Sequence, residues 1–233
     1  MAKILNIDTS TSLSSVALSI DGEITIGLES SVKLDHSASL ASFVEECINY
    51  LKERNLKLDA VSVTAGPGSY TGLRIGLSMA KGIAFGFGIP LITLSSLEVM
   101  AVRAIFTFPE FEGYEKIVPM IDARRMEVYT GVYNSKLKSL MPACAMILDE
   151  NSFSEFNNEE RIIFIGDGTE KFKKIKNHDN IIWLGSGMPH AKYMVTLSEK
   201  YYSEQKFADI AYAVPSYLKD YQPTTPKKEF KKW

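Results

Sequence analysis

Two stretches of this chain follow the same plan, and this repetition is the strongest constraint on its fold. Residues 3–8 and residues 117–122 are apolar runs that each end in an aspartate, and a short polar turn follows both. A second run then alternates between the two faces of a strand. One face carries Val16, Leu18 and Ile20 after the first turn, and Val128, Thr130 and Val132 after the second. The two halves are therefore predicted to be diverged copies of one unit.

The rest of the first half gives the order of elements in that unit. Asp21-Gly22 is a strong hairpin signal, so a third antiparallel strand is expected after it. Helical spacing of apolar residues then alternates with short apolar strands. The predicted elements are a strand with Ile24, Ile26 and Leu28 on one face, a helix over 37–54 with Ser37 as its N-cap, a strand over 59–65, a helix over 72–87, a strand over 88–94 and a helix from 95 to about 106.

The second half continues with a strand over 161–165, a turn at 166–168, a short lysine-rich helix, a strand over 181–184 and a final helix from about 190 to 202. Three strands, a helix, a strand, a helix and a strand describe the ribonuclease H-like unit. Its doubled form is the actin-like ATPase (ASKHA) architecture. We therefore predict an α/β fold of two small subdomains with mixed sheets.

The predicted subdomains are residues 1–106 and 107–220, followed by a basic tail at 221–233. The Pro- and Gly-containing segment 107–115 marks the boundary between them. The final helix of the chain is expected to pack back on the first subdomain.

The charge of the chain offers no global attraction to nucleic acid or to a membrane. The formal net charge is −2 over 233 residues, and 45% of the residues are hydrophobic, as in an ordinary globular protein. One basic cluster stands out in the tail, where lysines alternate with aromatic residues: Lys227, Lys228, Phe230, Lys231, Lys232 and Trp233. Such a cluster is either a solvated chain end or a contact for phosphates and bases.

The cysteines and the apolar runs indicate a cytoplasmic protein. Cys47 and Cys144 are far apart and lack metal-ligand spacing, which suits a reduced compartment. The chain starts without a signal-peptide pattern. The longest apolar run, residues 82–94, is too short to span a bilayer, which needs about 20 residues. No membrane association is expected.

The two strand-ending aspartates are candidates for phosphate or Mg²⁺ contacts across a shared cleft. Hydroxyls and turn N–H groups that follow a buried strand can also bond phosphate oxygens. The alternative is that each aspartate simply caps a turn. The candidate nucleotide or phosphate residues are Asp8, Thr9, Ser10, Thr11, Asp122, Gly166 and Gly168.

The glycine-rich loop at residues 66–72 lies between a strand and a helix, where anions often bind. It is not a Walker A loop, because no Gly-Lys-Ser/Thr follows. It is not a dinucleotide fingerprint, because its last interval is one residue too long. A tight structural turn is the alternative interpretation.

The helix after this loop carries small residues in two stripes. Gly72, Gly76, Ala80, Ala84 and Gly88 recur every fourth residue, and Ser78, Gly82 and Gly86 form a second stripe. Each interior glycine costs about 1 kcal/mol relative to alanine, and close packing of another helix would compensate. A protein–protein interface is favoured over internal packing alone. The predicted contact residues are Gly72, Leu73, Gly76, Leu77, Ala80, Ile83 and Ala84, with Phe43 and Cys47 from the preceding helix.

Few residues suit catalysis. The three histidines, His36, His178 and His190, do not pair at metal-ligand spacing, and no Gly-x-Ser-x-Gly elbow occurs. We predict no catalytic residue, no metal and no cofactor of the chain's own, apart from the nucleotide and Mg²⁺ considered above.

Three blocks of the chain resemble the bacterial TsaB (YeaZ) family: residues 4–11, residues 65–76 and residues 121–129, supported by Pro215-Ser-Tyr-Leu-Lys219. That family is a paralogue of TsaD and was long labelled glycoprotease-like (M22). The resemblance implies a non-catalytic accessory subunit in the synthesis of threonylcarbamoyladenosine in tRNA. It also implies partners: a TsaD-type transferase, a TsaE-type ATPase, a second copy of the chain when alone, and tRNA indirectly.

One comparison with the TsaD relatives bears on catalysis. They carry a His-x-x-x-His metal pair after the strand that follows the glycine-rich helix, where this chain has Ser96 and Met100. A hydroxyl and a thioether are poor ligands for Zn²⁺ or Fe²⁺. The resemblance therefore favours an accessory role over the alternative of a stand-alone ATPase or peptidase.

Overall fold

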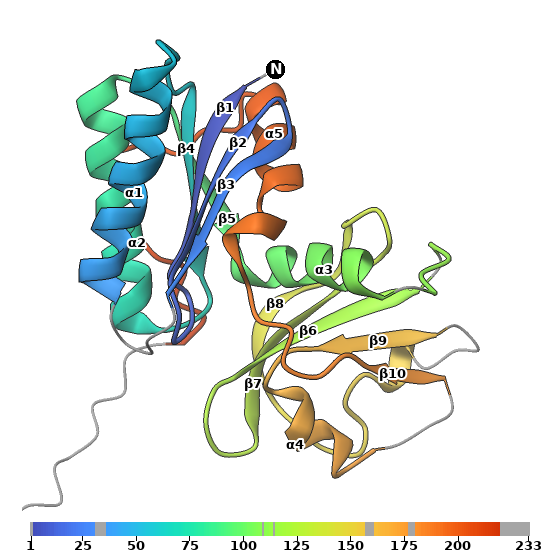
Figure 1. Cartoon of the computed structure of the whole chain (residues 1–233). Helices are drawn as coiled ribbons and strands as arrows, with labels where there is room; N and C mark the ends of the chain where they lie inside the picture. Colours follow the sequence, from blue (N-terminus) through green and yellow to red (C-terminus); the bar gives the residue numbers. More distant parts are fainter. Residues whose placement is uncertain are drawn as a thin grey trace, which may run out of the picture.

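A computed structural model describes residues 2–30, 36–108, 110–113, 115–156, 161–176 and 180–219, with backbone alone for 36–38. These residues form two five-stranded mixed sheets (Figure 1). The strand order is β3-β2-β1-β4-β5 in the first sheet and β8-β7-β6-β9-β10 in the second, so each strand has a counterpart in the other sheet. The duplicated ribonuclease H-like plan predicted from the sequence is confirmed.

The first sheet is built from β1 (Lys3–Asp8), β2 (Ser15–Ile20), β3 (Glu23–Glu29), β4 (Ala60–Gly66) and β5 (Leu91–Ser95). The first three strands form an antiparallel meander, and β4 and β5 continue parallel to β1. The two central strands β1 and β4 are buried on both faces, which explains their nearly continuous apolar runs. β3 lies at one edge.

Helices cover both faces of the first sheet. The pair α1 (His36–Glu53) and α2 (Tyr70–Phe87) packs on one face over a core that includes Leu5, Leu40 and Val63. The other face meets α3 (Ser96–Thr107), the short turn η2 (Ala191–Tyr193) and α5 (Val195–Ser203). Figure 1 shows α5 on the opposite side of this sheet from α1 and α2. The final helix of the chain thus packs on β1 and β5.

The second sheet consists of β6 (Lys116–Asp122), β7 (Glu127–Tyr133), β8 (Ser139–Ile147), β9 (Ile162–Ile165) and β10 (Ile181–Trp183). The helix α3 packs against β6, β7 and β9 as well as against the first sheet, so it forms the joint between the two lobes. On the other face, α4 (Thr169–Lys173) closes a core rich in aromatic rings.

The second copy departs from the first after its third strand. The repeated pattern predicts a helix there, but the described residues contain only the single turn η1 (Ser154–Phe156). In this connection Ser152 Oγ donates to Asp149 Oδ1 at 2.9 Å and accepts from Asp149 N at 2.9 Å, so these two residues close a turn. Side-chain bonds of this kind stabilise a turn in competition with a helix.

Two predicted helix boundaries shift. α2 begins at Tyr70, two residues before the predicted start at 72, because the Ser69 side chain accepts from the Gly72 N–H and caps the helix. The last helix is divided into η2 and α5, whereas a single helix over 190–202 was predicted. The His190 side chain accepts from the Lys192 N–H and caps η2 instead.

Several predictions lie outside the described residues. These are the side chains of His36 and Ser37, the residue His178, and the tail cluster of Lys227, Lys228, Phe230, Lys231, Lys232 and Trp233. Of the helices in the described part of the chain, none is long and apolar enough to cross a membrane.

A segment that we call the C-terminal strap, residues 208–219, returns from α5 to the α2 side of the first lobe. Ala208 N donates to Leu91 O at 2.8 Å, and Lys81 Nζ of α2 donates to the carbonyls of Ala211 and Ala213 at 3.1 and 3.2 Å. Further on, Ser216 N donates to Ala65 O at 2.7 Å. The strap is therefore fixed both to α2 and to the glycine-rich loop.

Candidate functional site

The aspartate that ends β1 is buried and bonded within its own lobe. The Asp8 side chain is 1% exposed. Its Oδ1 accepts from Thr64 Oγ1 at 2.6 Å and from Ser10 Oγ at 2.7 Å, so the carboxylate ties β4 to the turn after β1. These bonds give Asp8 a structural role in this lobe.

The hydroxyl run after Asp8 closes on the glycine-rich loop. Thr9 Oγ1 donates to Gly72 O at 2.7 Å, and Ser10 O accepts from Ser69 N at 2.7 Å. A Cβ at Gly68 would lie 2.2 Å from Ser10 O, and one at Gly72 would lie 2.0 Å from Thr9 O. The loop glycines thus permit a close approach of two backbones, and the Ser69 N–H at the start of α2 is already bonded to Ser10 O.

The second-lobe candidates are also bonded internally. Asp122 Oδ1 pairs with Lys171 Nζ at 2.9 Å and accepts from Arg124 N at 2.6 Å. The Gly166 N–H donates to Gly185 O at 2.7 Å, and the Gly168 N–H donates to Met120 O at 3.2 Å. A nucleotide at these glycines would therefore have to displace existing bonds.

Asp167, which the sequence reasoning did not single out, belongs to the same corner. Its Oδ1 accepts from Asp122 N at 2.8 Å. Burial and the charge of Asp122 raise the pKa of the Asp167 carboxyl above its ordinary value. Thr11 sits at the rim of the first turn, and its hydroxyl is 3.5 Å from both the N and the O of Leu13. Nucleotide and Mg²⁺ binding remain predictions that these contacts do not support.

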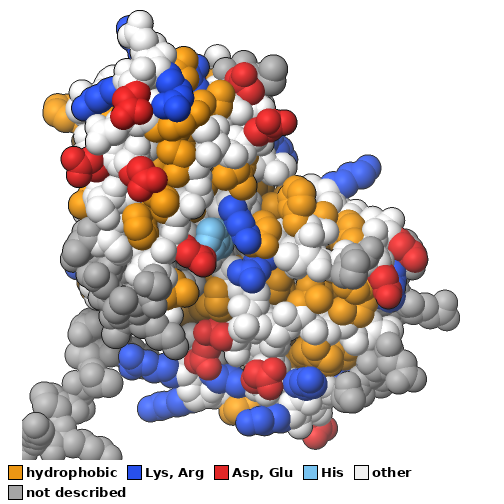
Figure 2. Space-filling model, viewed as in Figure 1, with side chains coloured by type: hydrophobic (Ala, Val, Ile, Leu, Met, Phe, Trp, Pro, Cys, Tyr) orange, Lys and Arg blue, Asp and Glu red, His pale blue; other side chains and the backbone are white. Residues whose placement is uncertain are grey.

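His190 lies where the two lobes meet, and Figure 2 shows a histidine in the middle of that face. Its Nε2 is 2.9 Å from Glu29 Oε2, and its Nδ1 accepts from Lys192 N at 3.1 Å. Burial lowers the pKa of the imidazole, against the opposing effects of Glu29 and Asp8. Within the described ranges, no three His, Cys, Asp or Glu side chains come close enough together to hold a metal ion.

The position of the TsaD-type histidine pair is occupied by core packing. Ser96 and Met100 are both 0% exposed. A Cβ at Gly166 would lie 2.4 Å from Met100 Cε, so the thioether fills the space between α3 and the second sheet. Met100 packs in the core that α3 shares with the second sheet, and Ser96 is buried beside β5 at the start of α3.

The predicted contact residues on α2 face inward, and this is a correction. The seven α2 residues and Cys47 are buried within the chain, and Phe43 is half-buried against the same core. A Cβ at Gly76 would lie 2.2 Å from Thr9 Oγ1. The first small stripe therefore serves internal packing against the turn after β1, and these residues do not form the surface that a partner would touch: Gly72, Leu73, Gly76, Leu77, Ala80, Ile83, Ala84 and Cys47.

The outward face of α2 is formed by the second stripe. Ser78, Gly82 and Gly86 are exposed, and a Cβ at either glycine would meet nothing within 4 Å. Phe85 beside them is 82% exposed. The sequence contained the signal for this, because the first stripe shares its helix face with Leu73, Leu77 and Ile83, whereas the second does not. Phe85 was missed altogether.

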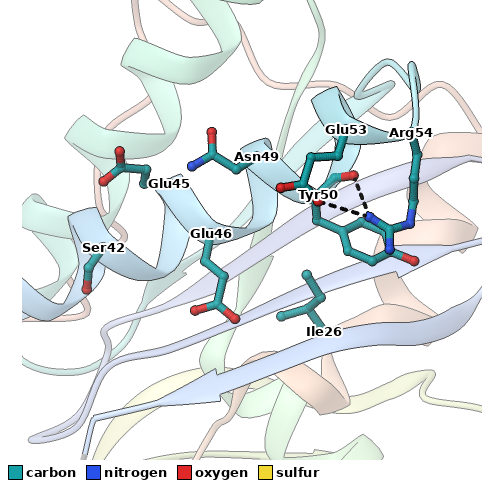
Figure 3. A pocket seen from close by; sticks show the side chains of 8 residues that line it. All are labelled: Ile26, Ser42, Glu45, Glu46, Asn49, Tyr50, Glu53 and Arg54. Atoms are coloured by element: carbon teal, nitrogen blue, oxygen red, sulfur yellow. Dashed lines mark hydrogen bonds and ion pairs between the residues drawn. The ribbon is translucent and has the colours of Figure 1, made fainter.

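A shallow groove of about 430 Å³ runs along α1 beside the edge strand β3 (Figure 3). Figure 3 shows Glu46 and Tyr50 pointing toward β3, where Ile26 lies. Two further carboxylates, Glu45 and Glu53, line it. The one guanidinium, that of Arg54, lies 3.7 Å above the Tyr50 ring and bonds Tyr50 O at 3.2 Å. The groove therefore suits a cationic side chain better than a phosphate.

The repeated sheets and the shared helix α3 place this chain in the class of duplicated, two-lobed actin-like folds. The family model for tRNA N6-adenosine threonylcarbamoyltransferase (TsaD) matches residues 30–231. The chain belongs to the TsaB/YeaZ family. Members of this family are paralogues of TsaD, and the TsaD family model matches them as well.

Two relatives and one solved structure illustrate the similarity. The tRNA threonylcarbamoyladenosine biosynthesis protein TsaB of Bacillus subtilis is 31% identical over 93% of both chains. TsaB of Haemophilus influenzae is 36% identical over 58% of this chain and 56% of its own length. The structure of YeaZ from Pseudomonas aeruginosa matches with a TM-score of 0.79 at 25% identity, covering 94% of this chain and all of that one.

Proposed function

We propose that this protein is a non-catalytic, cytoplasmic accessory subunit in the synthesis of threonylcarbamoyladenosine in tRNA. It binds a TsaD-type transferase through the outward faces of α1 and α2, and the resulting pair recruits a TsaE-type ATPase. The observation that carries the proposal is the outward stripe of Ser78, Gly82 and Gly86, which faces open space in the folded chain. Family membership supplies the pathway.

The cost in helix stability of the glycines in the outward stripe supports the binding of a partner helix there. Gly82 and Gly86 each cost about 1 kcal/mol of helix stability relative to alanine, and none of the residues that the structure describes packs on them to compensate. Small residues let a second helix approach the backbone closely. Phe85 adds a large exposed ring next to the outward stripe, and large aromatic side chains are common at the centre of an interface.

The acidic side of α1 is the second part of the proposed contact surface. Glu45, Glu46 and Glu53 line the groove beside β3, with Tyr50 and Ile26 as its apolar part. A partner that covers both helices would therefore present small and apolar residues to α2 and basic side chains to α1. A second copy of the chain would compete for the same surface, so we infer that the homodimer and the heterodimer exclude each other.

The absence of a catalytic role is inferred from how the candidate groups are used. Asp8, Thr9 and Ser10 are bonded to β4 and to the glycine-rich loop. Ser96 and Met100 are both fully buried, and Met100 packs in the core between α3 and the second sheet. tRNA is handled by the complex rather than by an active site in this chain, and no observation favours an independent ATPase or peptidase.

Reconstitution tests the proposal. The chain, a TsaD-type subunit, a TsaE-type subunit, a tRNA transcript, threonine, bicarbonate and ATP are mixed, and each component is omitted in turn. The chain alone should form no modified nucleoside and hydrolyse no ATP, whereas the full set should form product. The double variant Gly82→Gln, Gly86→Gln should lose product in proportion to lost complex.

A matched control keeps the result interpretable. Thr196 and Lys200 are exposed on α5 with the same spacing of four residues. The double variant Thr196→Gln, Lys200→Gln should assemble and support modification as the unchanged chain does. Full modification without this chain, or nucleotide or peptide turnover by the chain alone that Asp8→Ala abolishes, would refute the accessory role.

A further inference from the structure

An aromatic and cationic cluster stands at the start of α2. The rings of Tyr70 and Tyr217 stack with centroids 5.2 Å apart, and both side chains are more than two-fifths exposed. The Arg74 guanidinium lies 4.0 Å above the Tyr70 ring, and its Nε donates to Tyr217 Oη at 3.0 Å. An exposed pair of rings with a guanidinium beside it is the kind of platform on which nucleic-acid bases stack.

The strap that carries Tyr217 is fixed in place by the glycine-rich loop. Ser216 N donates to Ala65 O at 2.7 Å, and a Cβ at Gly66 would lie 2.7 Å from Ser216 O. Gly66 also has a φ of 118°, which disfavours other residues. The loop thus positions the Tyr217 ring before any ligand arrives.

The strap then crosses to the second lobe. Lys219, two residues after Tyr217 and so within about 7 Å along the chain, forms an ion pair with Glu127 at the start of β7. Lys171 pairs with Asp122 at 2.9 Å and donates to Glu127 O at 3.1 Å. The carboxylates of Asp122 and Glu127 are therefore offset by these two lysines.

The β6–β7 turn beside them presents two arginines. Arg124 and Arg125 have φ angles of 68° and 48°, a conformation that non-glycine residues rarely adopt, least of all twice in succession. The turn is held by Arg124 N to Asp122 Oδ1 at 2.6 Å and by Glu127 N to Arg124 O at 3.1 Å. Both side chains are exposed, and within the described residues neither guanidinium has an ion-pair partner.

Contacts connect these features stepwise, since Lys219 follows Tyr217 by two residues and pairs with Glu127, and Glu127 N donates to Arg124 O. The ring stack and Arg74 are at one end, Lys219 is in the middle, and Arg124 and Arg125 are at the other end. We propose that this track binds a single-stranded segment of RNA, with bases on Tyr70 and Tyr217 and phosphates on Arg124 and Arg125. The proposal rests on the function proposed above, and it assigns a direct RNA contact to a chain whose role there is otherwise indirect.

RNA fits this track better than the other anionic ligands. A free nucleotide needs one compact phosphate site, whereas the cations here are spread over two lobes. An acidic protein surface would pair with the arginines but would leave the exposed rings without a specific role. Alternating rings and cations match the alternation of bases and phosphates along a strand.

Fluorescence anisotropy with an unmodified tRNA transcript tests the track, using the full chain with its TsaD-type partner over a range of salt concentrations. The double variant Arg124→Asn, Arg125→Asn removes two cations, and asparagine tolerates this backbone conformation well, so the turn should remain folded. Each phosphate contact on a single strand contributes about 0.7 to the slope of log affinity against log salt concentration. Loss of two contacts should therefore make this slope shallower by about 1.4.

The ring variants test base stacking. Tyr217→Leu should weaken RNA binding about five- to 150-fold, the range expected for loss of one stacked base. Tyr217→Phe keeps the ring, loses only the bond to Arg74, and should bind nearly as the unchanged protein does. Thermal denaturation of both variants shows whether the strap and lobe remain folded.

Lys136 and Lys138 provide the control, since both are exposed at the far end of β7, about 20 Å from the arginine turn. Replacing both by glutamine removes the same charge and should leave the salt slope unchanged. The track is refuted if the asparagine variant keeps the full slope, or if it loses the TsaD-type partner instead of RNA. A failure of the accessory role would appear differently, as no complex with the unchanged chain.

Discussion

At the scale of single residues, the glycines of α2 are of two kinds. Gly76 is enclosed, with Thr9 Oγ1 only 2.2 Å from where a Cβ would stand, whereas Gly82 faces open space. The same residue type therefore reports close internal packing at one position and an unoccupied surface at the other. A four-residue spacing of small residues does not tell an inward-facing glycine from an outward-facing one. The distinction comes from whether the glycine shares a helix face with Leu73 and Leu77.

Alanine at these two glycines should act in opposite directions. Gly82→Ala should raise the free energy of unfolding by about 1 kcal/mol, because it improves helix propensity without a clash. Gly76→Ala should lower it by about 2 kcal/mol, because Thr9 is buried on a packed turn and cannot move aside. Urea titration of both variants measures this, and equal effects would contradict the assignment of inner and outer faces.

The two cysteines should differ in reactivity. Burial raises the pKa of the Cys47 thiol to about 12, so almost no thiolate exists at pH 8. Cys144 is half-buried and its pKa is raised by burial as well. In the native protein, iodoacetamide should leave Cys47 unmodified and modify Cys144 slowly, and both should react fully in urea. Mass spectrometry gives the result, and rapid native alkylation of Cys47 would show that α1 is not packed as described.

At the scale of elements, α1 and α2 were correctly predicted as helices. The residues predicted to face a partner were chosen wrongly, because most of them are buried. Periodicity identifies a helix, but the identity of its buried face depends on what packs against it. In α2 that neighbour is the turn of Thr9 and Ser10, more than fifty residues earlier in the chain. Hydrogen bonds between such distant residues leave no local pattern in the sequence.

The segment between α3 and β6 is held by Arg161, whose guanidinium pairs with Glu110, Glu112 and Glu115. Glu115 is fully buried and accepts from the N–H groups of Glu112 and Gly113, and Arg161 Nη2 lies 2.7 Å from its Oε1. Burial alone raises the pKa of the Glu115 carboxyl, but these N–H groups and Arg161 outweigh it and hold the pKa below its ordinary value.

Arg161→Met should destabilise the protein by about 2 kcal/mol at pH 7, because it leaves a buried carboxylate without its cation. A lowered folded-state pKa stabilises the protein above the ordinary carboxyl pKa, and this contribution is lost as pH falls through the folded value. The variant should therefore lose less stability than the unchanged protein between neutral pH and pH 3. Urea titrations at several pH values measure the free energy of unfolding of both proteins. If the two curves of stability against pH run parallel, the ion pair of Arg161 and Glu115 does not contribute to the pH dependence of stability.

At the scale of the whole molecule, the duplication was readable because both copies keep a buried strand, a terminal aspartate and an alternating second strand. The copies then diverged in ways that single residues decide. Asp149 and Ser152 close a turn between β8 and β9, and His190 caps η2 ahead of α5. The C-terminal strap could not be predicted, because its contacts with Ala65 and Arg74 join residues far apart in the chain.

Binding of the TsaD-type subunit to the outward face of α2 is the central claim, and titration calorimetry tests it most directly. The double variant Gly82→Gln, Gly86→Gln should bind that subunit at least about tenfold more weakly than the unchanged chain, a loss of about 1.4 kcal/mol. Its free energy of unfolding, measured on the same samples, should be unchanged or higher. Unchanged affinity in this stably folded variant would contradict the account, because the partner would then dock elsewhere.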